Sequence, residues 1–149
     1  MTRFEGDRDF PHPADALFAR LSDARFLVQC IPDVESVKSQ EANGAVLVLR
    51  PGFSFVRGTL EVTMQIVDAV PPVSERVLLH SKGIGSSSDV EATLTLAAQE
   101  SGTRVHWTAE VKSLGGLLKM IPTGLVRGAA EKVINDAWER VTAKLAEGA

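Results

Sequence analysis

Three histidines and a single cysteine are the side chains in this sequence that could hold a metal ion or activate a nucleophile. His12 stands between two prolines, whereas His80 and His106 fall on predicted strands. No two of these residues have the spacing that places two metal ligands on one element, and Cys30 stands alone. No nucleophile-elbow motif marks a serine either. We therefore predict no metal site, no cofactor and no catalytic residues, and interpret Cys30 as a small buried hydrophobic residue.

The segment Gly83-Ile84-Gly85 is the other place where chemistry could reside, because glycine pairs occur in phosphate-binding loops. Such a loop must lead into a helix N-terminus. Here three serines and an aspartate lead into another predicted strand. The segment is therefore interpreted as a turn or a bulge.

The composition of the chain limits its possible classes of partner and its cellular location. The chain has 149 residues and a formal net charge of −3, and no cluster of Lys and Arg marks a nucleic-acid surface. The first residues are charged and give no apolar signal region. No apolar run approaches the ~20 residues that span a bilayer. We expect one domain, residues 1–149, in the cytoplasm.

The order of predicted elements indicates a sheet followed by one long helix. A first strand at 4–10 precedes two short helices, which end near Ile31. A final helix is predicted from Leu114 to Ala146, with a kink or restart near Pro122, because proline inside a helix costs ~3 kcal/mol. Between them, alternation and turn signals predict six strands, at Val34–Ser39, Ala45–Arg50, Phe55–Val67, Val77–Lys82, 90–99 and 104–112.

The hydrophobic pattern predicts how these elements pack. Along 60–66 apolar residues alternate with polar ones, so one face of the sheet is dry and the other wet. The final helix carries one apolar stripe, formed by Val126, Ala130, Val133, Ile134, Ala137, Val141 and Leu145. Burying the dry face against this stripe predicts an α+β helix-grip fold, in which a curved antiparallel sheet of about seven strands wraps around the long C-terminal helix.

Short motifs spread over nearly the whole chain carry a family resemblance. They are Phe4-x-Gly6, the helix from Leu17 to Leu21 followed by Asp23, Cys30-Ile31-Pro32, Gly58-x-Leu60, Gly102-Thr103 and Gly115-Gly116-Leu117. Together they resemble the START/Bet v 1-like (SRPBCC) superfamily, and within it the CoxG family of small accessory proteins of carbon monoxide dehydrogenase. The resemblance implies a helix-grip fold. It also implies an association with the molybdenum-containing type of carbon monoxide dehydrogenase, and the binding of lipid-like molecules such as quinones.

On this interpretation a hydrophobic or amphipathic small molecule binds between the sheet and the C-terminal helix. Pro122, Gly124 and Gly128 would either let the entrance move or merely mark the beginning of the helix. The predicted lining consists of apolar residues from the strands and from the start of the final segment, namely Phe53, Phe55, Leu60, Val62, Met64, Leu94, Leu96, Trp107, Leu118, Ile121 and Leu125.

Two other functions stay open. A polyketide cyclase or aromatase-like enzyme of the same fold would need a polar residue with a shifted pKa inside the cavity, whereas the predicted inward residues are nearly all aliphatic. A protein-interaction module would need a large exposed apolar groove. A transient membrane or enzyme-complex partner is compatible with the carrier interpretation, and the sequence leaves the oligomeric state open.

Overall fold

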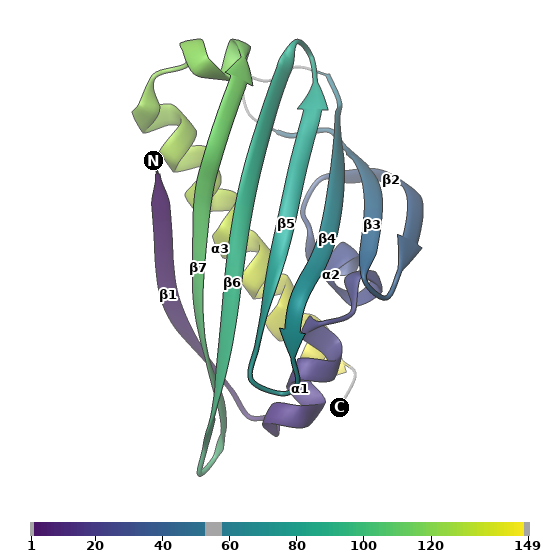
Figure 1. The fold of residues 1–149 in the computed structure, drawn as a ribbon, viewed down its shortest axis with the longest axis vertical. Coiled ribbons are helices and arrows are strands. Elements are labelled where there is room, and N and C mark those ends of the chain that lie inside the picture. The colour runs from purple at the N-terminus through teal and green to yellow at the C-terminus, as the bar shows by residue number, and fades with distance from the viewer. Residues whose placement is uncertain (1, 53–57, 148–149) are drawn as a thin grey trace.

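A single antiparallel sheet and a long helix lying across one of its faces make up the computed structural model, which describes residues 2–52 and 58–147 (Figure 1). The seven strands lie in the order β1-β7-β6-β5-β4-β3-β2. This is the α+β helix-grip arrangement that the sequence predicts. The elements are β1 (Arg3–Phe10), α1 (Ala14–Leu21), α2 (Ala24–Cys30), β2 (Val34–Glu41), β3 (Gly44–Leu49), β4 (Leu60–Val70), β5 (Ser74–Gly83), β6 (Ser86–Gln99), β7 (Gly102–Gly116), the 3₁₀ helix η1 (Leu117–Met120) and α3 (Thr123–Glu147).

The sheet has an inner face, which is turned toward α3, and an outer face. Residues 77 and 79 of β5 and residue 94 of β6 are inner-face positions, whereas their neighbours in sequence point outward. The short helices α1 and α2 also pack on the inner face, α1 against β6 and β7 and α2 against β3 and β4 (Figure 1). Asp23 caps α2, because its carboxylate accepts a hydrogen bond from the Arg25 backbone N–H at 2.9 Å.

The two halves of α3 pack differently against the sheet. Its buried residues are Trp138, Val141 and Leu145, all in the C-terminal half. They join Leu17, Phe18 and Leu21 of α1 and inner-face residues of β6 in the largest core cluster. The N-terminal half of α3 has no fully buried residue. The helix is thus anchored at the α1 end of the sheet and stands away from it at the other end.

One predicted boundary is wrong, and the reason is strand pairing. The helical pattern predicts a final helix from Leu114, but β7 runs to Gly116, where Ser87 and Ser86 of β6 pair with Gly115 and Gly116. Two consecutive glycines are poor helix formers, so the ladder prevails over the helical pattern. The predicted break near Pro122 is confirmed, since α3 begins at Thr123.

The β5–β6 connection confirms the turn predicted at residues 83–85. Ile84 and Gly85 both have positive φ values, 54° and 67°. Two such residues between Gly83 and Ser86, which pair with each other, form a tight hairpin turn and no phosphate loop. Of the strand predicted at Phe55–Val67, residues 55–57 lie outside the described part, and β4 runs from Leu60 to Val70.

Candidate ligand-binding pocket

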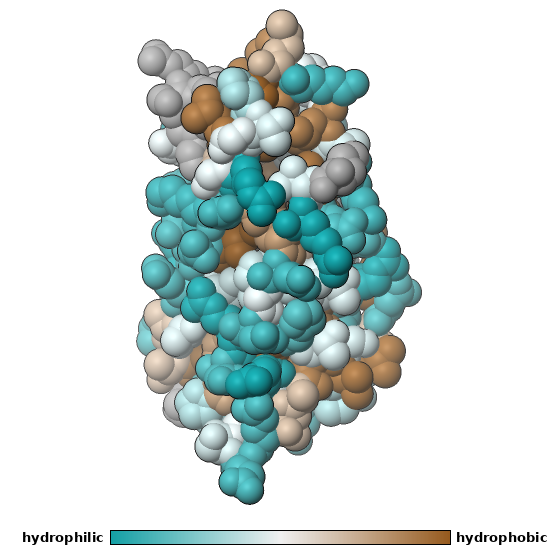
Figure 2. All heavy atoms as spheres, turned by 90° about the vertical axis from the view of Figure 1, so that its left-hand side faces the viewer, coloured by the Kyte–Doolittle hydropathy of each residue, from teal (hydrophilic) through white to brown (hydrophobic). Residues whose placement is uncertain are grey.

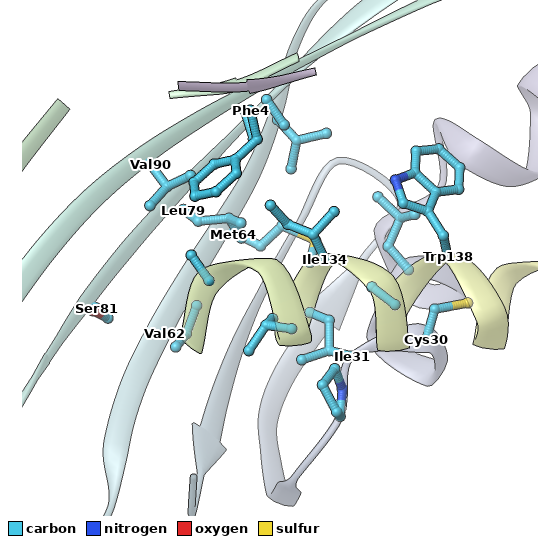
Figure 3. A pocket seen from close by; sticks show the side chains of 18 of the residues that line it. Phe4, Cys30, Ile31, Val62, Met64, Leu79, Ser81, Val90, Ile134 and Trp138 are labelled. Carbon is cyan, nitrogen blue, oxygen red and sulfur yellow. The ribbon is translucent and has the colours of Figure 1, made fainter. Parts of the chain in front are cut away.

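A pocket of about 420 Å³ lies between the inner face of the sheet and the half of α3 that stands away from it. Strands β4, β5, β6 and β7 supply one wall, and α3 supplies the other. In Figure 3, Ile134 on α3 lies opposite Met64 and Leu79 on the sheet, and Phe4 of β1 covers one side. The lining is almost entirely apolar. Its few polar residues are Asp33, Ser81, Ser88 and Thr108.

One end of the pocket is closed, and it is called the floor. Its residues come from α1, three strands and α3, and each is at most 8% exposed. The floor residues are Leu21, Met64, Val77, Leu94, Trp138 and Val141.

The opposite end, called the mouth, is partly open to solvent. Val133 is 36% exposed, and Leu60, Ser81, Ser88 and Val90 are half-buried. In Figure 3, Ser81 lies at one end of the pocket and Trp138 and Cys30 lie at the other. The side of the molecule near β1 shows hydrophobic atoms in a hollow that hydrophilic residues surround (Figure 2). On this side the Arg127 guanidinium lies over the Phe4 ring, 4.9 Å from its centroid. The pocket is therefore a blind apolar channel.

The polar groups of the channel are unevenly satisfied. At the mouth the hydroxyls of Ser81 and Ser88 hydrogen-bond each other across β5 and β6. Deeper in, the indole Nε1 of Trp107 is buried without a hydrogen-bond partner in the described part of the chain. The ring packs against Gly6, where an added Cβ would lie 3.0 Å from it. The glycine thus gives Trp107 the room to lie flat against β1.

Cys30 also lines the pocket, and its thiol is unreactive at neutral pH. Burial raises the pKa of its thiol to about 11. This effect of burial is larger than the opposing effect of the nearby cations Lys144, Arg140 and Arg20. Its Sγ donates to the Phe26 carbonyl oxygen at 3.5 Å. A thiol with such a pKa is a weak nucleophile, which agrees with the interpretation of Cys30 as a small hydrophobic residue.

The strand histidines lie on the outer face, away from the pocket. His80 Nδ1 is 2.7 Å from an oxygen of Asp89, and His106 Nδ1 is 2.9 Å from an oxygen of Asp7. Both rings are about half exposed. Within residues 2–52 and 58–147, no three His, Cys, Asp or Glu side chains are grouped to hold a metal ion. The apolar lining of the pocket offers burial of apolar ligand surface.

Comparison with known families places the chain. The model of the CoxG family, whose name denotes a subunit of carbon monoxide dehydrogenase, matches residues 6–146. The chain belongs to the CoxG family. The resemblance predicted from the motifs is thereby confirmed. No curated protein matches this CoxG-family chain.

Solved structures share the fold at low sequence identity. A conserved protein from Geobacillus kaustophilus has a TM-score of 0.85 at 19% identity and covers 98% of this chain and 96% of its own. A protein from Arthrobacter aurescens gives 0.70 at 16%, with coverages of 97% and 86%. The AHSA1 protein from Silicibacter pomeroyi gives 0.65 at 18%, with coverages of 99% and 100%. These likenesses concern the fold alone. Within the described part of the chain, no helix has the length and apolar character needed to cross a bilayer.

The predicted site residues divide into three groups in this CoxG-family structure. Those that line the pocket are Leu60, Val62, Met64, Leu94 and Trp107. Four predicted residues do not line it. Leu96 packs in the core cluster near α1. Leu118 lies in η1, Ile121 in the break after η1, and Leu125 in the first turn of α3. Phe53 and Phe55 lie outside the described residues. Contact of any of them with a ligand stays a prediction.

Several residues of the pocket were missed by sequence reasoning. The floor includes Trp138, whereas the predicted stripe contains its neighbour Ala137. The spacing Ile134, Trp138, Val141 would have found it, because residues three and four apart share a helix face. Cys30, Ile31 and Pro32, at the end of α2, also line the pocket, so the Cys30-Ile31-Pro32 motif marks pocket residues as well as the family.

Glu75 was missed for a different reason. It is 1% exposed, and neither carboxyl oxygen has a hydrogen-bond partner in the described part of the chain. Burial raises the pKa of this carboxyl to about 8. The period of two that places Val77 and Leu79 on the inner face also places Glu75 there, but the predicted strand begins only at Val77.

Proposed function

We propose that the chain binds a hydrophobic or amphipathic small molecule, lipid or quinone-like, in the pocket between the inner face and α3. The observation that carries the proposal is a blind apolar channel of about 420 Å³ with a half-exposed mouth. Pockets of about 300–1,000 Å³ with apolar walls are typical of small-molecule sites. Each Å² of apolar ligand surface buried there contributes about 25 cal/mol.

The shape of the channel supports an elongated ligand. Val77 at the floor and Ser81 near the mouth are four residues apart on one strand. At ~3.3 Å per residue this separation is about 13 Å. A chain or narrow ring system fits such a space with its long axis parallel to β5.

Membership of the CoxG family supports the finer part of the proposal, a role as an accessory or carrier protein of a carbon monoxide dehydrogenase-like enzyme. In this role the partner is transient, because a carrier must take up its ligand in one place and release it in another. We place this activity in the cytoplasm, where a lone thiol such as Cys30 stays reduced.

The protein's own fluorescence tests the proposal. The chain has two tryptophans and no tyrosine, and both tryptophans line the pocket. Titrating the delipidated protein with a decyl-substituted benzoquinone should quench this fluorescence saturably, and native mass spectrometry should show a one-to-one complex. An absence of quenching and of complex would refute ligand binding of this class.

A pair of variants on one strand locates the binding. Ala92 lines the pocket, whereas Ala97 on the same strand is exposed on the outer face. Ala92→Phe should fill the channel and abolish quenching, and Ala97→Phe should leave the titration unchanged. Equal titrations for both variants would place the quinone outside the pocket.

One observation favours the enzyme alternative as a second candidate. A buried carboxyl with a raised pKa, Glu75, is the kind of group that acid–base catalysis uses. A cyclase or aromatase-like activity on a linear polyketide mimic, abolished by Glu75→Gln, would support this alternative over a carrier.

A further inference from the structure

Glu75 lies directly beyond the floor of the pocket. Its inner-face neighbour along β5 is Val77, and its partner across the β5–β6 ladder is Leu94. Both of these residues are floor residues. Side chains directly opposite each other in a ladder have Cβ atoms about 5 Å apart, and alternate residues on one strand are ~6.6 Å apart. Glu75 is therefore a direct neighbour of two floor residues.

No hydrogen bond from the described part of the chain holds this carboxyl. Both of its oxygens are buried and without a hydrogen-bond partner. The cations on the elements around this end of the sheet have other contacts: Arg76 pairs with Asp68 and Glu91, Arg25 pairs with Asp23, and Arg20 stacks on Phe26.

The carboxyl is held in its neutral form. Neither those cations nor Arg140 and Lys144 of α3 contribute to its pKa, which burial alone raises to about 8. At neutral pH the group is therefore an acid with an O–H to donate. A buried donor without a partner is unfavourable, so a ligand atom that accepts its hydrogen bond is favoured in return.

To meet a ligand in the channel, the Glu75 side chain must change its rotamer. Glutamate has three rotatable bonds, and no hydrogen bond or ion pair from the described residues opposes a change of rotamer here. We propose, on the basis of the proposed carrier function, that Glu75 is the specificity-determining residue of the pocket, and that its carboxyl donates a hydrogen bond to a carbonyl-type acceptor on the end of the ligand that enters first.

This assignment names a ligand class. A pure hydrocarbon would fill the channel but leave the carboxyl unpaired. A molecule with a carbonyl oxygen at its deep end and an apolar body would satisfy both the floor and the walls. The other end of the ligand would meet the hydroxyls of Ser81 and Ser88 at the mouth.

A pair of isosteric probes tests the assignment. In 2-undecanone and 2-methylundec-1-ene the same chain carries either a carbonyl oxygen or a methylene group. Each is used to displace N-phenyl-1-naphthylamine from the full-length protein at pH 7. The ketone should bind about tenfold more tightly than the alkene, the effect of one buried hydrogen bond. In Glu75→Leu this ratio should fall to about one, and in Glu75→Gln, which keeps an N–H donor, most of it should persist.

The controls separate this assignment from the carrier proposal. Glu100→Leu, at an exposed position in the β6–β7 turn, should keep the tenfold ratio. Displacement by neither probe would overturn the carrier proposal and the assignment with it. Equal displacement by both, or a ratio that survives in Glu75→Leu, would overturn the role of Glu75 and leave the carrier intact.

A pH series keeps the test decisive if Glu75→Leu does not fold. Ionisation above pH 8 removes the O–H donor, so the wild-type preference for the ketone should disappear at pH 9. Glu75→Gln has no such proton and should keep its preference at both pH values. A pH-independent preference in the wild type would overturn the assignment.

Discussion

Charged and ionisable side chains have opposite surroundings on the two faces of the sheet. On the outer face, cations and carboxylates of neighbouring strands form a network of ion pairs, among them Arg104 with Asp9 at 2.8 Å and Lys112 with Glu110 at 3.1 Å. On the inner face, the Glu75 carboxyl is buried with no partner among the described residues. The same strand, β5, carries Arg76 outward into the network and Glu75 inward.

The number of ion pairs is therefore a poor measure of their contribution to the free energy of unfolding. Exposed pairs contribute about 0–1 kcal/mol each, because water solvates both partners almost as well. A buried polar group has lost that solvation, so one unpaired carboxyl outweighs several outer pairs. Changes on the two faces should differ accordingly in their effect on the free energy of unfolding.

The largest effect is expected where a charge is placed on the inner face. Met64 is 2% exposed and packs at the floor with Leu47 and Val77. Met64→Lys buries an ammonium group without a carboxylate partner, and should lower the free energy of unfolding by more than about 4 kcal/mol or prevent folding. Urea denaturation followed by circular dichroism measures the change.

The neighbouring outer-face position supplies the control. Gln65 is exposed on the same strand, and Gln65→Lys should change the stability by at most about 0.5 kcal/mol. Similar losses for the two variants would mean that the two faces are not distinct in the way described.

The next effect is a dependence of stability on pH that Glu75 alone produces. Its pKa is about 8 in the folded protein against 4.5 ordinarily. Between these values the folded state holds a proton that the unfolded state has released. Its stabilising effect is thus fully present below pH 4.5 and is lost as the pH rises toward 8. From pH 5 to 7.5 the free energy of unfolding should fall by about 3 kcal/mol, at about 1.36 kcal/mol per unit.

Glu75→Gln removes the titrating group and should flatten this dependence. The paired carboxylates Asp9, Glu61 and Glu91 have lowered pKa values, so their contributions change below this window. Urea melts of both proteins at five pH values provide the comparison. If the dependence on pH persists in Glu75→Gln, a group other than Glu75 produces it.

The sequence predicts this architecture well where the pattern is local. Alternation along residues 60–66 predicts the inner and outer faces of β4, and the restart at Pro122 predicts the beginning of α3. The prediction fails at Gly115 and Gly116, since their pairing with β6 is a non-local contact that no window of the sequence contains.

The site was less predictable for a related reason. A pocket exists because one half of α3 stands away from the sheet, which is a property of tertiary packing. Glu75 is absent from the predicted site because a polar residue at the end of an apolar alternation marks, in most proteins, the end of the buried strand. Its burial is a property of tertiary packing, which the strand pattern does not contain.

The smallest effect is expected on the outer face, at His106. Its ring is about half exposed and lies 2.9 Å from an oxygen of Asp7 and 3.7 Å from one of Glu5. His106→Ala removes a solvated pair and should change the free energy of unfolding by at most about 0.5–1 kcal/mol. Quinone quenching of the tryptophans should stay unchanged, because Trp107, next in sequence, points to the pocket. A loss of binding in this variant with normal stability would show that the outer face communicates with the pocket. The contrast between an inner face that carries the proposed binding site and an outer face that tolerates change would then no longer hold.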